Sequence, residues 1–316
     1  VEAADAAGMP AMIAENERGE VRQLSWAQLR QQVAALATTL RELGVQPGDR
    51  VAAYLPNIPE AAVALMATAS VGAVWSICAP DMGTHAVLDR FKQIEPVVLI
   101  GADSIRYAGT DHDRREVLRE LRAALPSVRH AIGLHADAQS PLEAWLDMAT
   151  VLARSDVDGA HFEPVNVPFD HPLWVVYSSG TTGLPKPIVH GHGGVLLAGV
   201  SQSCLHHDIG ASYQSNSWGE RFHWYSSTGW VMWNAQLAGL LLGTTCVIFD
   251  GSPAGPKQAP DWGTLWRFAG RHEVTVFGAG AAFYANCLKA EVKLSDYPGL
   301  ARVRTLGSTG SPLSEE

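Results

Sequence analysis

Residues 177–186 combine the side chains that proteins use to hold phosphate groups. The segment reads Tyr-Ser-Ser-Gly-Thr-Thr-Gly-Leu-Pro-Lys, with four small hydroxyl residues, two glycines and one lysine close together. Glycine lets the backbone curl so that several N–H groups point at one anion. The hydroxyls add donors, and Lys186 adds a mobile point charge. We therefore predict a loop that holds nucleotide phosphates; a flexible linker is the weaker alternative, because apolar segments flank the loop on both sides.

This loop differs from the P-loop of kinases and related phosphotransferases. The P-loop pattern has Gly directly before its Lys and Ser or Thr directly after it. Here Pro185 precedes Lys186 and Pro187 follows it. The two prolines prevent the loop from continuing straight into a helix at the lysine. The sequence therefore disfavours a phosphotransferase.

Two further segments carry small polar residues next to apolar ones. Residues 224–234 read Trp-Tyr-Ser-Ser-Thr-Gly-Trp-Val-Met-Trp-Asn, four aromatics around a polar turn. Residues 306–313 read Leu-Gly-Ser-Thr-Gly-Ser-Pro-Leu. Taken alone, the first is typical of a core aromatic cluster at a helix start, and the second of a strand that ends in a glycine turn.

The composition limits the classes of function. The chain has 316 residues, of which 47% are hydrophobic and 17% charged, as in a globular protein with a large core. Its net charge of −9 gives no basic field for nucleic acid or an acidic membrane. We expect no nucleic-acid partner and no membrane insertion. Four scattered cysteines, Cys78, Cys204, Cys246 and Cys287, suggest reduced, buried thiols in a cytoplasmic protein.

Strands that alternate with helices must position these loops. Residues 25–43 are the clearest helix, because Ser25 and Gln28 form a capping box and Gly44 supplies the stop. Further helices are predicted at 58–71, 84–93, 114–125, 194–203, 233–242, 262–271 and 281–292. Strands are predicted at 51–55, 73–77, 97–100, 173–177, 246–250, 274–277 and 303–306.

This alternation predicts an α/β fold with mostly parallel sheets covered by helices. We place a first subdomain at residues 1–170 and a second, incomplete at its C-terminal end, at residues 171–316. Ligands of such sheets bind beyond the carboxyl ends of the strands, where both glycine-rich loops are expected to lie.

The loop at residues 177–186 resembles the phosphate loop of the adenylate-forming superfamily, which includes acyl-CoA synthetases, adenylation domains and luciferases. In that family the loop closes over the β- and γ-phosphates of ATP. The resemblance implies that these phosphates are held by Ser178, Ser179, Gly180, Thr181, Thr182, Gly183 and Lys186. It also implies a catalytic role for Lys186, Thr181 and Thr182, which would hold the leaving pyrophosphate.

The aromatic segment is similar to that of the acetoacetyl-CoA synthetase group. By this resemblance the acyl group is lined by Trp230, Val231, Met232 and Thr309, and the adenine ring is framed by Gly310, Ser311 and Pro312. Arg106 lies near where related acetyl-CoA synthetases use arginines on the phosphates of coenzyme A.

The resemblance implies ATP-dependent ligation of acetoacetate to coenzyme A through an acyl-adenylate, with AMP and pyrophosphate as products. ATP, Mg²⁺ and coenzyme A are the expected cofactor and co-substrates, and no metal ligand is expected within this chain. We expect a Mg²⁺-binding Glu and a C-terminal domain beyond Glu316, so that these 316 residues alone are inactive. The alternatives are a synthetase for another short acid, such as acetate or butyrate, and a non-catalytic nucleotide-binding protein.

Overall fold

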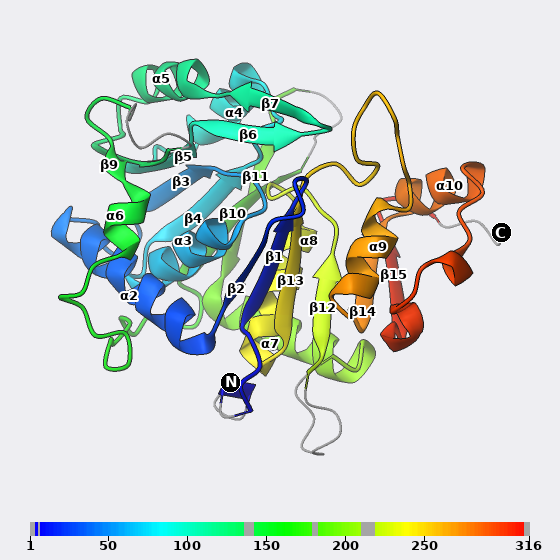
Figure 1. The fold of residues 1–316 in the computed structure, drawn as a ribbon. Helices are drawn as coiled ribbons and strands as arrows, with labels where there is room; N and C mark the ends of the chain where they lie inside the picture. The colour runs from blue at the N-terminus through cyan, green and yellow to red at the C-terminus, as the bar shows by residue number, and fades with distance from the viewer. Residues whose placement is uncertain (1–3, 6, 136–141, 179–182, 210–218, 313–316) are drawn as a thin grey trace.

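The computed structural model describes residues 4–5, 7–135, 142–178, 183–209 and 219–312. Two large sheets lie side by side, with helices between them and on their outer faces (Figure 1). A short β-hairpin projects from the first sheet toward the second. The predicted α/β class with mostly parallel sheets is confirmed.

Within the described residues the larger sheet has seven strands in the order β11-β10-β4-β3-β5-β8-β9. The strands are β3 (Arg50–Tyr54), β4 (Val74–Cys78), β5 (Val98–Ala102), β8 (His130–Leu134), β9 (Leu146–Asp147), β10 (Pro172–Ser178) and β11 (Lys186–Gly191). All neighbours are parallel except β10 and β11, which form an antiparallel pair at one edge.

The second sheet has six described strands in the order β15-β14-β12-β13-β1-β2. The strands are β1 (Met12–Asn16), β2 (Val21–Leu24), β12 (Arg221–Trp224), β13 (Thr245–Asp250), β14 (Val276–Gly280) and β15 (Thr305–Thr309). Only the edge pair β1–β2 is antiparallel. The separate hairpin consists of β6 (Ser104–Tyr107) and β7 (Thr110–Asp113).

Alternating residues of the strands assign the helices to layers. Val51 and Ala53 join a core with α2 and α3, whereas Ala52 lies on the opposite face with α4 and α5. In the second sheet, Met12 faces the same central core and Ile13 faces α9 and α10. The helices are α2 (Trp26–Glu42), α3 (Pro59–Ser70), α4 (Thr84–Phe91), α5 (Arg115–Ala124), α6 (Met148–Leu152), α7 (His192–Ser201), α8 (Val231–Ala238), α9 (Thr264–Arg271) and α10 (Ala281–Lys289).

The long helices and the predicted strands lie within a few residues of their expected positions. The Ser25–Gln28 capping box is present, with both reciprocal hydrogen bonds. Several strands were not predicted: β1, β2, β6, β7, β8, β9, β11 and β12. The prolines around Lys186 do prevent a helix there, and the chain continues as strand β11.

Sheet membership does not follow the predicted division at residue 170. β1 and β2 precede that position but belong to the second sheet, where β1 pairs with β13. β10 and β11 follow it but belong to the first sheet, where β10 pairs with β4. Each sheet therefore contains strands from both sides of residue 170. Parallel strands can pair although they are distant in the sequence, because a crossover connection joins them.

Three of the four cysteines are buried, as the sequence predicts. Cys78, Cys246 and Cys287 are buried, and none of the four takes part in a disulfide. Cys204 is exposed, which corrects the expectation that all four thiols are buried. None of the helices in the described part of the chain combines the length and the hydrophobicity that a membrane-spanning helix requires.

Candidate active site

The predicted phosphate loop connects two antiparallel strands. Ser178, the last residue of β10, is the register partner of Lys186, the first residue of β11. Gly183 has φ +117°, a backbone conformation that residues other than glycine rarely adopt. Ser178 and Lys186 are therefore the last paired residues before the connection between the two strands, and Gly183 lies within that connection. Ser179, Gly180, Thr181 and Thr182 lie outside the described residues.

Helix α4 and the segment just after it support both sides of this hairpin. The Tyr177 hydroxyl donates to the Arg90 carbonyl at 2.9 Å, and the Gln93 amide donates to the Pro185 carbonyl at 2.8 Å. Lys186 itself is exposed. The hairpin thus offers an exposed ammonium group on a supported backbone, which suits an anionic group.

The aromatic segment 224–234 is anchored on the end of β3. The Thr228 hydroxyl donates to the Leu55 carbonyl at 2.9 Å, and the Trp233 indole donates to the Asn57 side chain at 2.9 Å. All of these groups are buried. These bonds join the two sheets and hold the polar turn between β12 and α8 in place.

The aromatic segment and the β15 loop meet in one cavity of about 440 Å³. From the aromatic segment it is lined by Trp224, Tyr225, Ser226, Ser227, Trp230 and Met232, and from the β15 loop by Thr309, Gly310 and Ser311. Pro253, Trp262, Phe283 and Asn286 are among the remaining lining residues. We call this space the acyl cavity, because the predicted acyl-lining residues Trp230, Met232 and Thr309 share it.

Val231 is not among the described residues that line the acyl cavity. It is the first residue of α8 and its side chain is 47% exposed. Successive side chains on a helix point about 100° apart, so Met232 faces inward while Val231 faces away. Of the three residues 230–232, Trp230 and Met232 therefore share this cavity, and the acyl-lining role of Val231 stays a prediction.

Two glycines allow the Trp224 ring to form part of the cavity wall. A Cβ atom at Gly278 would lie 2.1 Å from the ring, and one at Gly307 would lie 2.4 Å from it. Both distances are far below van der Waals contact, so strands β14 and β15 need glycine where the indole packs against them. The position of the Trp224 ring in the cavity wall therefore depends on glycine at positions 278 and 307.

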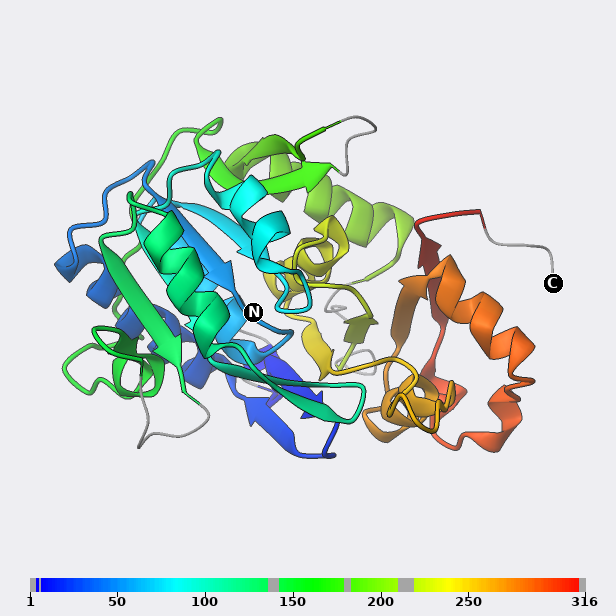
Figure 2. The same cartoon turned by 90° about the horizontal axis from the view of Figure 1, so that it is seen from above.

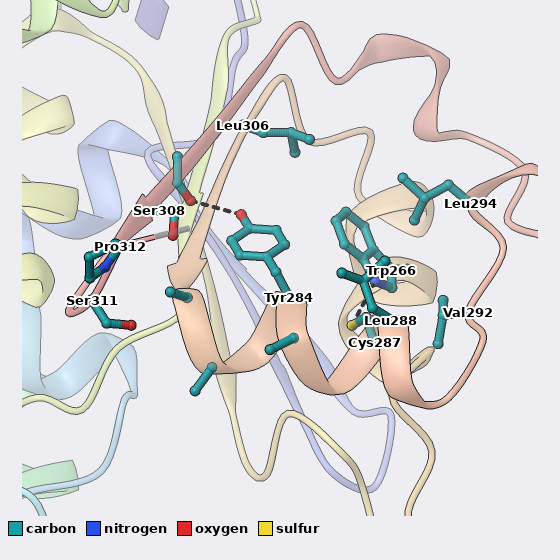
Figure 3. Close-up of a pocket in the computed structure, with 14 residues that line it drawn as sticks. Trp266, Tyr284, Cys287, Leu288, Val292, Leu294, Leu306, Ser308, Ser311 and Pro312 are labelled. Carbon is teal, nitrogen blue, oxygen red and sulfur yellow. Dashed lines mark hydrogen bonds between the residues drawn. The ribbon is translucent and has the colours of Figure 1, made fainter. Parts of the chain in front are cut away.

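The predicted adenine-framing residues lie on a ridge between two spaces. Gly310 and Ser311 line the acyl cavity, whereas Ser311 and Pro312 line a second cavity of about 450 Å³. Figure 3 shows this second cavity, in which Tyr284 bonds to the β15 backbone. The Tyr284 hydroxyl donates to the Gly307 carbonyl at 2.7 Å, which fixes the strand just before the ridge.

Arg106 lines a third cavity of about 270 Å³, which we call the hairpin cavity. Its wall includes Tyr107, Asp81 and Asp250, and it shares Tyr225, Ser226 and Ser227 with the acyl cavity. The Arg106 guanidinium pairs with Asp111 at 3.0 Å on the hairpin surface. Burial raises the pKa of Asp250 to about 7, with Glu17 adding to the rise and Arg22 opposing it. The hairpin cavity thus combines a cation with a carboxyl group that titrates near neutral pH.

Among the described residues, no group of three or more His, Cys, Asp and Glu side chains is arranged to hold a metal ion. Sequence reasoning did not identify Trp262 and Asn286 as cavity residues. They come from segments without a motif: Asn286 lies on α10, and Trp262 precedes α9 and contacts Phe283 of α10, with ring centroids 6.1 Å apart.

Comparison with known proteins identifies similar chains. Acetoacetyl-CoA synthetase of Danio rerio is 33% identical over 311 residues, which cover 96% of this chain and 45% of that protein. Acetoacetyl-coenzyme A synthetase of Rhizobium meliloti (strain 1021) is 38% identical over 306 residues, which cover 95% of this chain and 45% of that protein. The chain thus spans about half the length of the curated relatives that it matches.

A solved structure, acetoacetyl-CoA synthetase from Streptomyces lividans, has the same fold. It superimposes with a TM-score of 0.88 at 49% sequence identity. The matched region covers 99% of this chain and 47% of the synthetase chain. The AMP-binding enzyme family matches residues 2–316. The chain therefore belongs to the AMP-binding enzyme family.

Proposed function

We propose that the protein containing this chain ligates acetoacetate to coenzyme A through an acyl-adenylate. The observation that carries the proposal is the acyl cavity. Its wall unites Trp230, Met232 and Thr309 with Gly310 and Ser311. A carboxylate held by the first group would lie next to a nucleotide held by the second, as attack on the α-phosphate requires. The names of the relatives support acetoacetate as the acid.

In the first half-reaction a carboxylate oxygen attacks the α-phosphorus of ATP, and pyrophosphate leaves with the electrons of the broken P–O bond. The exposed Lys186 and the hydroxyl of Ser178 are the described groups that suit the leaving phosphates. We propose the same role for Thr181 and Thr182. Their contribution is charge neutralisation and positioning rather than bond making.

In the second half-reaction the sulfur of coenzyme A attacks the acyl carbon, and AMP leaves. We propose that coenzyme A approaches along the hairpin cavity, beside Arg106. Residues 225–227 line both this cavity and the acyl cavity, so the two spaces adjoin. A thiol in the hairpin cavity would therefore lie close to the acyl group. Asp111 is 55% exposed and also pairs with Arg18 at 2.9 Å, so it would keep a cationic partner if a phosphate of coenzyme A took its place beside Arg106.

The test is ATP–pyrophosphate exchange by the full-length protein with four acids. We expect acetoacetate to give the highest kcat/KM, ahead of butyrate, 3-hydroxybutyrate and acetate. A higher value with acetate would show that the acid is wrong while the reaction is right. No exchange with any acid would favour a non-catalytic nucleotide-binding protein. We also expect the isolated 316 residues to form no thioester, and the protein to reside in the cytoplasm.

A further inference from the structure

One buried carboxylate gathers three backbone N–H groups from distant parts of the chain. The Glu17 side chain accepts from Ala108 at 2.7 Å, from Gly109 at 2.8 Å and from Ser252 at 2.7 Å. It lies in the turn between β1 and β2, and its side chain is only 5% exposed. Charge-assisted bonds of this kind are about twice as strong as neutral ones. A buried carboxylate with so many donors must therefore hold these segments together.

The first two donors form the turn of the β6–β7 hairpin. Ala108 has φ +51° and Gly109 φ +82°, as in a tight two-residue hairpin turn. Alanine disfavours this conformation, and the Glu17 carboxylate compensates by accepting both turn N–H groups. A Cβ atom at Gly251 would lie 2.2 Å from the Glu17 side chain, so glycine there makes the approach possible. The turn, the carboxylate and this glycine form one matched unit.

These contacts fix opposite walls of the hairpin cavity. Arg106 and Tyr107 directly precede the turn, and Asp250 and Gly251 directly precede Ser252; all four line the cavity. The Arg106 guanidinium lies 3.9 Å from the Glu17 carboxylate. Figure 2 shows the hairpin extending from the first half of the molecule toward the loop after β13.

We propose that Glu17 is a positioning residue for the coenzyme A site. Its hydrogen bonds hold the β6–β7 hairpin next to the loop after β13 and so keep the two walls of the hairpin cavity in place. Its carboxylate also orients the Arg106 guanidinium. Glu17 does not touch the reacting atoms. The proposal rests on the proposed function, because it assumes that coenzyme A binds in this cavity.

The test is Glu17→Gln in the full-length protein, with steady-state kinetics for each substrate. A glutamine offers one acceptor oxygen and turns an NH₂ group toward the N–H donors, so the hairpin loses its anchor. We expect the KM for coenzyme A to rise on the order of 10-fold to 100-fold. ATP–pyrophosphate exchange, which needs no coenzyme A, should stay within about two-fold of wild type. The matched control is Glu20→Gln, an exposed glutamate on the same turn that bonds to Asn16, and it should change neither quantity.

A double-mutant cycle separates positioning from general structural support. If Glu17 acts through Arg106, then Glu17→Gln should raise the KM for coenzyme A much less in an Arg106→Ala background than in wild type. Glu17→Asp keeps the charge but withdraws the carboxylate by one methylene, and should give a smaller rise even if the Gln variant does not fold. An unchanged KM for coenzyme A in folded Glu17 variants, or an equal loss of exchange and ligation, would overturn the proposal. Absence of exchange in the wild-type protein would instead refute the proposed function.

Discussion

Asp250 gives the sharpest stability prediction, because its carboxyl group pays a desolvation cost in the folded protein. Its pKa is raised from 3.8 to about 7, first by burial and then by Glu17 and Glu60, while Arg22 opposes the rise. Between pH 4 and pH 7 the folded state therefore binds a proton that the unfolded state does not hold. The stability contributed by this group is complete below about pH 4 and is lost as the pH rises through 7.

The substitution Asp250→Asn removes that pH dependence. The difference between about 7 and 3.8 corresponds to at most about 4 kcal/mol. Asp250 is partly open to solvent in the hairpin cavity, so screening reduces the expected effect to about 2 kcal/mol. We expect Asp250→Asn to stabilise the protein by about 2 kcal/mol at pH 8 and by less than about 1 kcal/mol at pH 5.

Urea unfolding of the full-length protein, followed by tryptophan fluorescence at both pH values, measures this difference. The control is Asp158→Asn, an exposed carboxylate that pairs with His161. It should show no gain in stability at pH 8. Equal effects of Asp250→Asn at the two pH values, or destabilisation at pH 8, would refute the assignment of a raised pKa to this carboxyl.

Three further predictions concern the acyl cavity and the phosphate loop. Gly307→Ala should push the Trp224 ring into the acyl cavity and raise the KM for acetoacetate about 10-fold or more, since its Cβ would lie 2.4 Å from the ring; an unchanged KM would contradict the packing. Lys186→Ala should lower the rate of ATP–pyrophosphate exchange by on the order of 100-fold without changing the thermal midpoint, because the side chain is exposed. Thr228→Val should cost about 1–3 kcal/mol in chemical denaturation, because it leaves the buried Leu55 carbonyl without its donor.

Local patterns predicted the elements that carry their own signals. The helix at residues 25–43 has a capping box and an apolar face, and the structure contains it as α2. The apolar run before the phosphate loop was predicted as a strand, and β10 lies there. The family resemblance points to Trp230, Met232, Thr309, Gly310 and Ser311, and all five line one cavity.

Features that depend on distant partners could not be predicted. β1 is a five-residue strand whose place in the second sheet follows from pairing with β13, more than 200 positions away. β11 begins with Lys186-Pro187, and proline usually argues against a strand, but it is tolerated here on a sheet edge. Glu17 carries no motif, since its three donors come from segments 91 to 235 positions away.

The most direct test of the central claim follows an oxygen atom. Full-length protein is supplied with ATP, coenzyme A and acetoacetate labelled with ¹⁸O in its carboxylate, and the products are analysed by mass spectrometry. If the carboxylate attacks the α-phosphate, one labelled oxygen must appear in AMP and none in pyrophosphate. Label in inorganic phosphate, with ADP as the nucleotide product, would mean attack at the γ-phosphate and would contradict the acyl-adenylate route.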